Sequence, residues 1–155
     1  MRAELRSNDG LSAIALNLQR GFTYATEPGF EGSMQICGRH WDGDQTHDIN
    51  VAIAGMWLRE EDLRELRSVI ASWLARPLSE LNAELLQGEF QLARLPGQSV
   101  YIRFGSRPGV IGGRHVVVTV AFAAGPLSGE YYFLSDQSCF ECFNHELNAA
   151  LDGTG

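Results

Sequence analysis

The alternation of hydrophobic and polar positions changes its period in the last third of the chain. Residues 116–122 form a β-branched run that is apolar at both parities, which predicts a central strand, and residues 131–134 predict the next strand. From Ser135 the period becomes 3.6, which predicts a final helix with Ser135 as its N-cap and Gly153 just beyond its end. This part of the sequence predicts a sheet with a helix packed on it.

Similar patterns predict the remaining elements. Alternating or apolar segments predict strands at residues 14–18, 34–41, 44–53, 86–92 and 100–104. A buried stripe within residues 59–75 predicts a helix, with acidic residues at its start and Pro77 just after its end. Residues 78–85 fit either a short helical turn or a direct lead into the next strand.

Turn residues set the expected register of two hairpins. Asp42-Gly43 is typical of a two-residue type I′ turn, which places Trp41 opposite Asp44 and leaves apolar pairs on one face and polar pairs on the other. A three-residue loop at 96–98 with a bulge makes the apolar positions of the next two strands agree, with Phe90 opposite Phe104.

Together these elements predict an α+β fold. We expect a mostly antiparallel, curved sheet of about seven strands with two helices packed on it. Residues 1–155 are expected to form a single domain, in which residues 1–10 are a loose N-terminal lead-in.

Charge and composition narrow the expected partners. The net charge of −7 argues against nucleic acid as the principal partner, because binding to phosphates needs a basic patch. No apolar run has the length of a membrane span, and the first ten residues do not resemble a secretory signal, so a cytoplasmic protein is expected. Three cysteines are too few for a disulfide framework, and reduced thiols are the simplest interpretation.

The residues that can carry chemistry form no complete catalytic or metal-binding set. Cys139 and Cys142 form a C-x-x-C at a helix start, but Cys139 lies on the apolar stripe, which favours packing over redox chemistry. His40 and His47 share a face of the predicted hairpin without a third metal ligand. The sequence therefore nominates no catalytic residue, metal or cofactor, and it favours a protein that is not an enzyme.

One segment resembles a known group of proteins. Residues 130–140 contain an apolar strand, the step Ser135-Asp136-Gln137-Ser138 and the start of a helix. This arrangement is similar to the close of small bacterial immunity proteins paired with polymorphic toxins such as the WapI toxin, although those proteins carry an aromatic residue where this chain has Cys139. The resemblance implies a cytoplasmic, non-catalytic binding protein that neutralises a cognate bacterial toxin. The acidic net charge would favour a basic toxin.

Two other functions remain open at this point. The first is a small-ligand-binding or enzymatic domain that uses the concave face of the sheet. The second is an assembly subunit that uses an exposed strand edge.

The predicted hairpin between residues 34 and 53 supplies a candidate contact surface. Its polar face and tip carry Arg39, Trp41, Asp42, Asp44 and Asp48. Tryptophan is enriched at binding hot spots, and carboxylates accept hydrogen bonds from arginine or lysine of a basic partner. The alternative is that another element covers this face and that Trp41 belongs to the core.

Overall fold

In the computed structural model, which describes residues 1–153, a set of four strands and a helix occurs twice in succession. The first set consists of β1 (Arg2–Arg6), β2 (Ala13–Tyr24), β3 (Glu27–Trp41), β4 (Thr46–Arg59) and α1 (Glu60–Leu74). The second set consists of β5 (Gly88–Ala93), β6 (Gln98–Ser106), β7 (Val116–Ala124), β8 (Leu127–Ser135) and α2 (Gln137–Asp152). Two short 3-10 turns, Leu78–Glu80 and Ala83–Leu85, lie in the connection between the sets.

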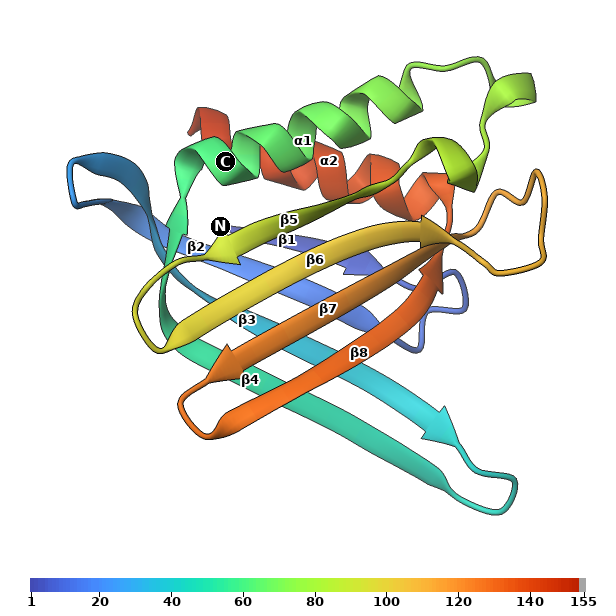
Figure 1. Cartoon of the computed structure of the whole chain (residues 1–155), viewed down its shortest axis with the longest axis horizontal. Coiled ribbons are helices and arrows are strands. Elements are labelled where there is room, and N and C mark those ends of the chain that lie inside the picture. Colours follow the sequence, from blue (N-terminus) through green and yellow to red (C-terminus); the bar gives the residue numbers. More distant parts are fainter. Residues whose placement is uncertain (154–155) are drawn as a thin grey trace.

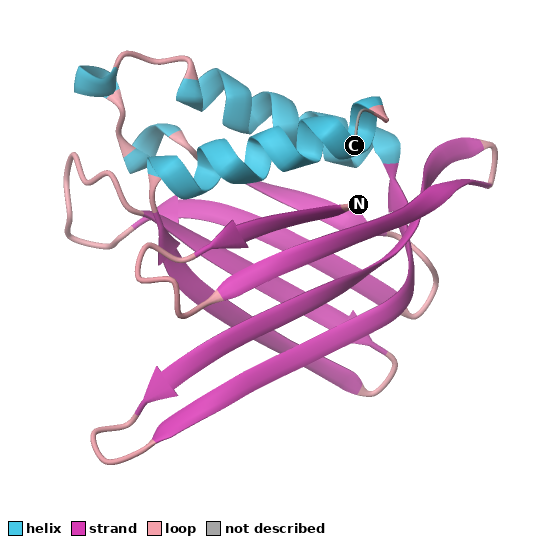
Figure 2. Ribbon diagram, turned by 180° about the vertical axis from the view of Figure 1, so that it is seen from behind, coloured by secondary structure: helices cyan, strands magenta, loops and turns pink. Residues whose placement is uncertain are grey.

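The strands form one antiparallel sheet in the order β1 to β8. A single residue pair, Leu58 with Ala93, joins β4 to β5, so we distinguish a first half-sheet (β1–β4) from a second half-sheet (β5–β8). The two half-sheets cross, and both helices lie along the same side of the molecule (Figures 1 and 2). The predicted α+β class, antiparallel pairing and two packed helices are confirmed. The sheet has eight strands rather than about seven, and it is not strongly curled.

The additional strand is β1, which lies in the segment expected to be a loose lead-in. Its Ala3 and Leu5 are fully buried, opposite Leu16 and Ile14 of β2. Helix α2 lies along β1, where the side chain of Glu146 accepts a hydrogen bond from the backbone N–H of Glu4 at 2.7 Å. Two apolar residues give too short an alternation to be recognised from sequence, and the burial comes from contacts with the distant end of the chain.

The core lies between the inner faces of the half-sheets and the two helices. Trp73 of α1 and Phe104 of β6 both meet Phe140 of α2 edge to face, with ring centroids 5.5 and 5.3 Å apart. Such aromatic contacts add to the stabilisation that comes from burying their large apolar surface. These core side chains occupy the inner face, on which the alternative ligand site was expected.

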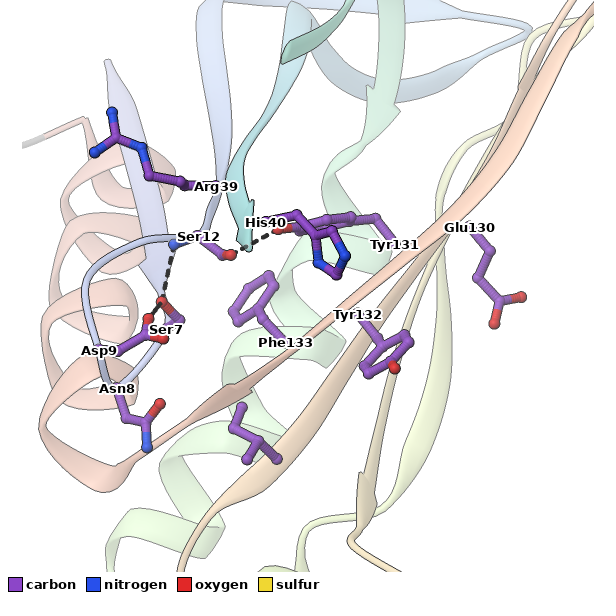
Figure 3. Close-up of a pocket in the computed structure, with 11 residues that line it drawn as sticks. Ser7, Asn8, Asp9, Ser12, Arg39, His40, Glu130, Tyr131, Tyr132 and Phe133 are labelled. Carbon is purple, nitrogen blue, oxygen red and sulfur yellow. Dashed lines mark hydrogen bonds between the residues drawn. The ribbon is translucent and has the colours of Figure 1, made fainter. Parts of the chain in front are cut away.

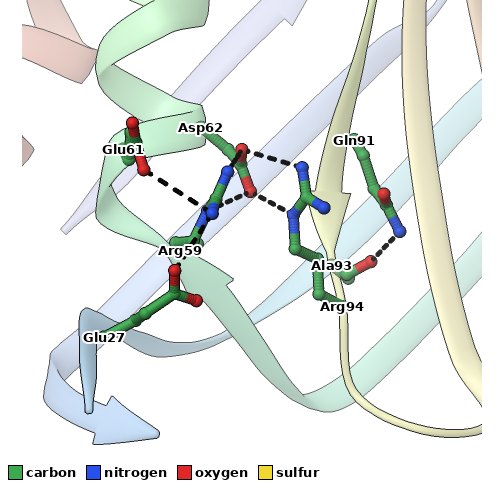
Figure 4. Close-up of polar contacts among 7 residues, drawn as sticks. All are labelled: Glu27, Arg59, Glu61, Asp62, Gln91, Ala93 and Arg94. Atoms are coloured by element: carbon green, nitrogen blue, oxygen red, sulfur yellow. Dashed lines mark hydrogen bonds and ion pairs between the residues drawn. The ribbon is translucent and has the colours of Figure 1, made fainter. Parts of the chain in front are cut away.

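A buried carboxylate joins the two half-sheets near the start of α1 (Figure 4). Asp62, whose side chain is 4% exposed, accepts hydrogen bonds from Arg59 at 2.7 Å and from Arg94 at 2.6 Å. Arg59 also reaches Glu27 of β3 at 3.1 Å. Burial alone would raise the pKa of Asp62, but hydrogen bonds and charge from the two guanidinium groups outweigh it and lower that pKa. This ion-pair network fixes β3, β4, α1 and the β5–β6 turn relative to one another.

The β3–β4 register differs from the prediction by two residues. Trp41 lies opposite Thr46, and the turn comprises four residues, 42–45. The side chain of Asp42 accepts hydrogen bonds from the backbone N–H groups of Asp44 and Gln45, which stabilises the longer turn. A shift of two keeps every side chain on its predicted face, so the hydrophobic pattern cannot distinguish the two registers.

The β5–β6 hairpin also differs in register. Phe90 lies opposite Ile102 rather than Phe104, and residues 94–97 form the connection. The predicted bulge exists, but it falls between Gln91 and Ala93 within β5 instead of in the loop.

Candidate functional site

The charge of the chain is divided unevenly between its parts. Residues 90–129 contain four arginines and one histidine but no aspartate or glutamate. This segment comprises residues 90–93 of β5, all of β6 and β7 and the first three residues of β8, so it makes up most of the second half-sheet. Glu89 and Glu130, which flank the segment, belong to the same half-sheet. The 19 acidic residues all lie outside it. The net charge of −7 is therefore the sum of a positive charge on residues 90–129 and a larger negative charge on the rest of the chain.

Four side chains that we call the outer platform lie on the side of the second half-sheet that faces away from the core: Tyr101, Arg103, Thr119 and Tyr132, of which Thr119 is buried at 9% exposure. The strand register places Arg103 beside Thr119 and Thr119 beside Tyr132, with Tyr101 two residues along β6. Tyr132 is 71% exposed. No helix lies over this face in Figure 1, where the second half-sheet is in front of the first.

The outer platform offers planar groups at the spacing of the strands. Two strand steps separate Arg103 from Tyr132, which corresponds to about 10 Å. The guanidinium of Arg103 reaches toward Glu89 at 3.5 Å and toward Glu130 at 3.6 Å. These distances are longer than those of the buried ion pairs, so the guanidinium is only loosely held by the two carboxylates.

The β6–β7 loop, residues 107–115, carries two further arginines beyond the end of the platform. Arg107 and Arg114 are exposed, and within residues 1–153 neither side chain makes an ion pair or hydrogen bond. The backbone N–H of Ala83 donates to the carbonyl oxygen of Gly113 at 2.8 Å, which fixes the loop to the segment before β5. The loop thus carries two cations at one end of the platform, and neither has a partner among residues 1–153.

Tyrosine rings and arginine planes on an open sheet can stack on flat, π-rich groups. Unpaired nucleobases are such groups, and their phosphates are attracted to arginine side chains. The combination of an aromatic platform with adjacent unpaired arginines is suited chemically to a ligand that has both planar rings and negative charge.

A hollow of about 380 Å³ lies at the β8 edge of the second half-sheet, beside Tyr132 (Figure 3). The hydroxyl groups of Ser12 and Tyr131 share a hydrogen bond of 2.6 Å, and the backbone N–H of Asn8 donates to the carbonyl oxygen of Leu134 at 2.9 Å. These contacts close one end of the hollow and hold the β1–β2 loop against β8.

The five residues predicted to contact a partner lie together at the end of the β3–β4 hairpin, on the first half-sheet. Arg39 pairs with Asp48 at 3.0 Å, and Asp42 and Asp44 lie in the turn. Trp41 is 64% exposed, so it is not part of the core. A role of this hairpin in binding stays a prediction.

The histidines of this hairpin lie opposite each other, as His40 and His47. The ring of His47 is hydrogen-bonded to the carboxylate of Asp42 at 2.7 Å, and this contact lowers the pKa of Asp42. Among residues 1–153, no three histidine, cysteine, aspartate or glutamate side chains are grouped to hold a metal ion.

The C-x-x-C segment does not have the electrostatics of a redox site. Cys37, Cys139 and Cys142 are all free thiols. Burial, together with the nearby carboxylate of Asp136, raises the pKa of the Cys139 thiol, whereas a redox-active first cysteine has a lowered pKa.

The chain was compared with known proteins. No protein-family model and no curated protein matches it. The structure of the plant transcriptional regulator PBF-2 aligns over 99% of this chain and 83% of that chain, with a TM-score of 0.48 and 11% identity. WHY1 from Arabidopsis thaliana aligns over 97% of this chain and 82% of that chain, with a TM-score of 0.46 and 8% identity. At these TM-scores, neither structure assigns a function to this chain.

Two expectations from the sequence are nevertheless wrong. The expected toxin-neutralising function and the exclusion of nucleic acid as a partner are contradicted, because one of the two solved structures named above is a plant transcriptional regulator and neither is an immunity protein. The resemblance at residues 135–138 has a local cause, since Asp136 caps α2 by accepting a hydrogen bond from the backbone N–H of Cys139. Nucleic acid was excluded on the basis of the net charge alone, which does not show that the charge is unevenly distributed along the chain.

No helix within residues 1–153 has the length and apolar character needed to span a membrane.

Proposed function

We propose that this protein binds single-stranded nucleic acid on the outer platform and the adjoining β6–β7 loop. The observation that carries the proposal is the position of Tyr101, Arg103 and Tyr132 on an uncovered sheet face, next to two arginines that have no partner in the described part of the chain, residues 1–153. Bases stack on the tyrosine rings, and phosphates approach Arg107 and Arg114.

The form of this surface favours a single strand over a duplex. Stacking on tyrosine requires a free base face, which a continuous duplex does not expose. Three arginines also neutralise few of the closely spaced phosphates of a duplex. If Arg103, Arg107 and Arg114 each contact one phosphate, the logarithm of the binding constant falls with the logarithm of salt concentration with a slope of about −2.

Two carboxylates limit the affinity of the platform. Glu89 and Glu130 lie on the outer strands of the second half-sheet and attract Arg103 in the free protein. A phosphate that binds Arg103 must displace these contacts and lies close to their negative charge. Glu130→Gln removes part of this repulsion, and this variant binds more tightly than the wild type.

Fluorescence anisotropy with labelled oligo-dT and oligo-rU of about 15 nucleotides tests the proposal. Tyr132→Ala and Arg103→Ala each weaken binding about tenfold or more, because each removes a stacking or charged contact. Trp41→Ala is the matched control, since it removes an exposed aromatic residue from the other half-sheet. Absence of binding by the wild type at low salt, or equal losses in the Trp41 and Tyr132 variants, would contradict the proposal.

A further inference from the structure

We infer that Ile111 is a wedge that inserts at the last base pair, and partly unstacks it, where a nucleic-acid duplex opens into the bound single strand. This inference rests on the proposed function and adds the kind of substrate, a junction between duplex and single strand. It derives from the exposure of Ile111, the way its loop is held, and the charges on either side.

Ile111 is 92% exposed, compared with 71% for Tyr132 and 64% for Trp41. At this exposure the side chain adds almost no buried apolar area to the fold. Its neighbour Val110 is 43% exposed, so the loop presents two adjacent apolar side chains to solvent. A single exposed hydrophobic residue is ordinary on a protein surface. Ile111 differs because its loop holds it outward and because arginines lie on both sides of it in the loop.

The loop holds Ile111 outward in a defined conformation. The backbone N–H of Val110 donates to the carbonyl oxygen of Arg107 at 3.2 Å, which closes a turn, and Gly112 follows with a φ of 71°. The hydrogen bond between Ala83 and Gly113 then fixes the return of the chain toward β7. A wedge must be presented in this way, because ordering a flexible loop on binding costs conformational entropy.

The charges around Ile111 match the end of a duplex. Arg107 precedes it and Arg114 follows it, and neither has a carboxylate partner within residues 1–153. At a junction the last base pair exposes a flat apolar surface, while phosphates of two strands lie on either side of it. An apolar side chain between two arginines complements this arrangement, and wedges of this chemistry separate base steps in other nucleic-acid-binding proteins.

The loop lies next to the proposed single-strand site. The loop joins the ends of β6 and β7, and Arg103 of the platform lies three residues before Ser106, the last residue of β6. Arg103 and Ser106 are about 10 Å apart along β6, and Ile111 lies five residues beyond Ser106 in the loop. A strand that leaves the duplex at Ile111 therefore passes along the loop before it reaches the platform on β6.

A forked duplex tests the inference. The fork has a single-stranded dT arm of about 15 nucleotides, and 2-aminopurine occupies the last base pair, where its fluorescence rises on unstacking. Anisotropy compares this fork with the same single strand. The test variant is Ile111→Ser. The matched control is Leu127→Ser, which removes a half-exposed apolar side chain from the first residue of β8, at the opposite end of the half-sheet.

The wild type and Leu127→Ser bind the fork about tenfold more tightly than the single strand and raise the 2-aminopurine fluorescence. Ile111→Ser loses both the preference and the fluorescence change while its affinity for the single strand stays within about twofold. Binding of the single strand without any preference for the fork overturns this inference alone. Absence of binding to either substrate overturns it together with the proposed function. Capture of the protein by anionic lipid vesicles, lost in Ile111→Ser and without fork binding, assigns the loop to a membrane surface and also overturns it.

Discussion

The hydroxyl end of Tyr131 in β8 occupies the space in which a β-carbon of Gly38 in β3 would lie. The same hydroxyl shares a hydrogen bond of 2.6 Å with Ser12, so one tyrosine connects the second half-sheet to two parts of the first. The crossing of the half-sheets at this point depends on glycine at position 38, because any side chain there would displace the tyrosine ring.

Gly38→Ala tests this close contact. We expect the variant to lose about 1–3 kcal/mol of unfolding free energy, since the added methyl group overlaps the ring and its hydroxyl. Gly105→Ala is the control, because position 105 is also in a strand but has open space around a built β-carbon. Urea denaturation measures both. Equal stabilities for the two variants would show that the half-sheets do not meet closely at Gly38.

The buried carboxylate of Asp62 makes stability depend on pH. Because the pKa of Asp62 is lowered in the folded state, its contribution is present above its unfolded pKa of about 3.9 and is lost as pH falls through the lower folded value. Asp62→Asn removes this contribution and leaves Arg59 and Arg94 facing each other, at a cost of about 2–3 kcal/mol at pH 7 after allowance for their partial exposure.

Denaturant melts at several pH values between 2 and 7 measure the unfolding free energy on both sides of the unfolded pKa of about 3.9. The control is Asp48→Asn, which removes an exposed pair with Arg39 and changes stability by less than about 0.5 kcal/mol. The assignment is wrong if Asp62→Asn has the same dependence on acid as the wild type.

The β2–β3 turn contains backbone strain that a substitution can release. Ala25 and Thr26 form this two-residue turn with φ values of 49° and 69°, in the region that favours glycine. We expect Thr26→Gly to raise the unfolding free energy by about 1 kcal/mol, because a β-branched residue is disfavoured in this conformation. Gly43→Ala, at a φ of 97° in the β3–β4 turn, is expected to lower the unfolding free energy instead. Thermal denaturation of the two variants measures both effects. A Thr26→Gly protein that is less stable than the wild type would show that the turn is not strained at this position.

Local patterns in the sequence predict the helices and the faces of most strands, because periodicity depends only on neighbouring residues. Helices α1 and α2 lie where the sequence predicted them, and Gly153 follows α2 with a φ of 67°. The N-cap of α2 is one residue later than predicted, at Asp136. The hydroxyl of Ser135 donates instead to the carbonyl oxygen of Arg6 at 2.6 Å, a contact 129 residues distant in the chain.

Long-range pairing accounts for what the sequence did not predict. β1 is recognisable only through α2 and β2, and the hairpin registers depend on side-chain hydrogen bonds such as those of Asp42. The candidate site did leave a signal in the sequence, the absence of acidic residues between 90 and 129. A single net charge concealed that signal. The alignment of Tyr132 with Arg103 across three strands required the register of the sheet.

The most direct test of the nucleic-acid site is to locate the ligand on the protein. Backbone amide spectra of the ¹⁵N-labelled protein, recorded during titration with oligo-dT of about 15 nucleotides, report which residues sense the bound strand. We expect the perturbed amides to cluster at residues 99–119 and around Tyr132, and to recover as salt is added. Perturbations confined to the hairpin around Trp41, or no perturbation at low salt, would contradict a nucleic-acid site on the second half-sheet.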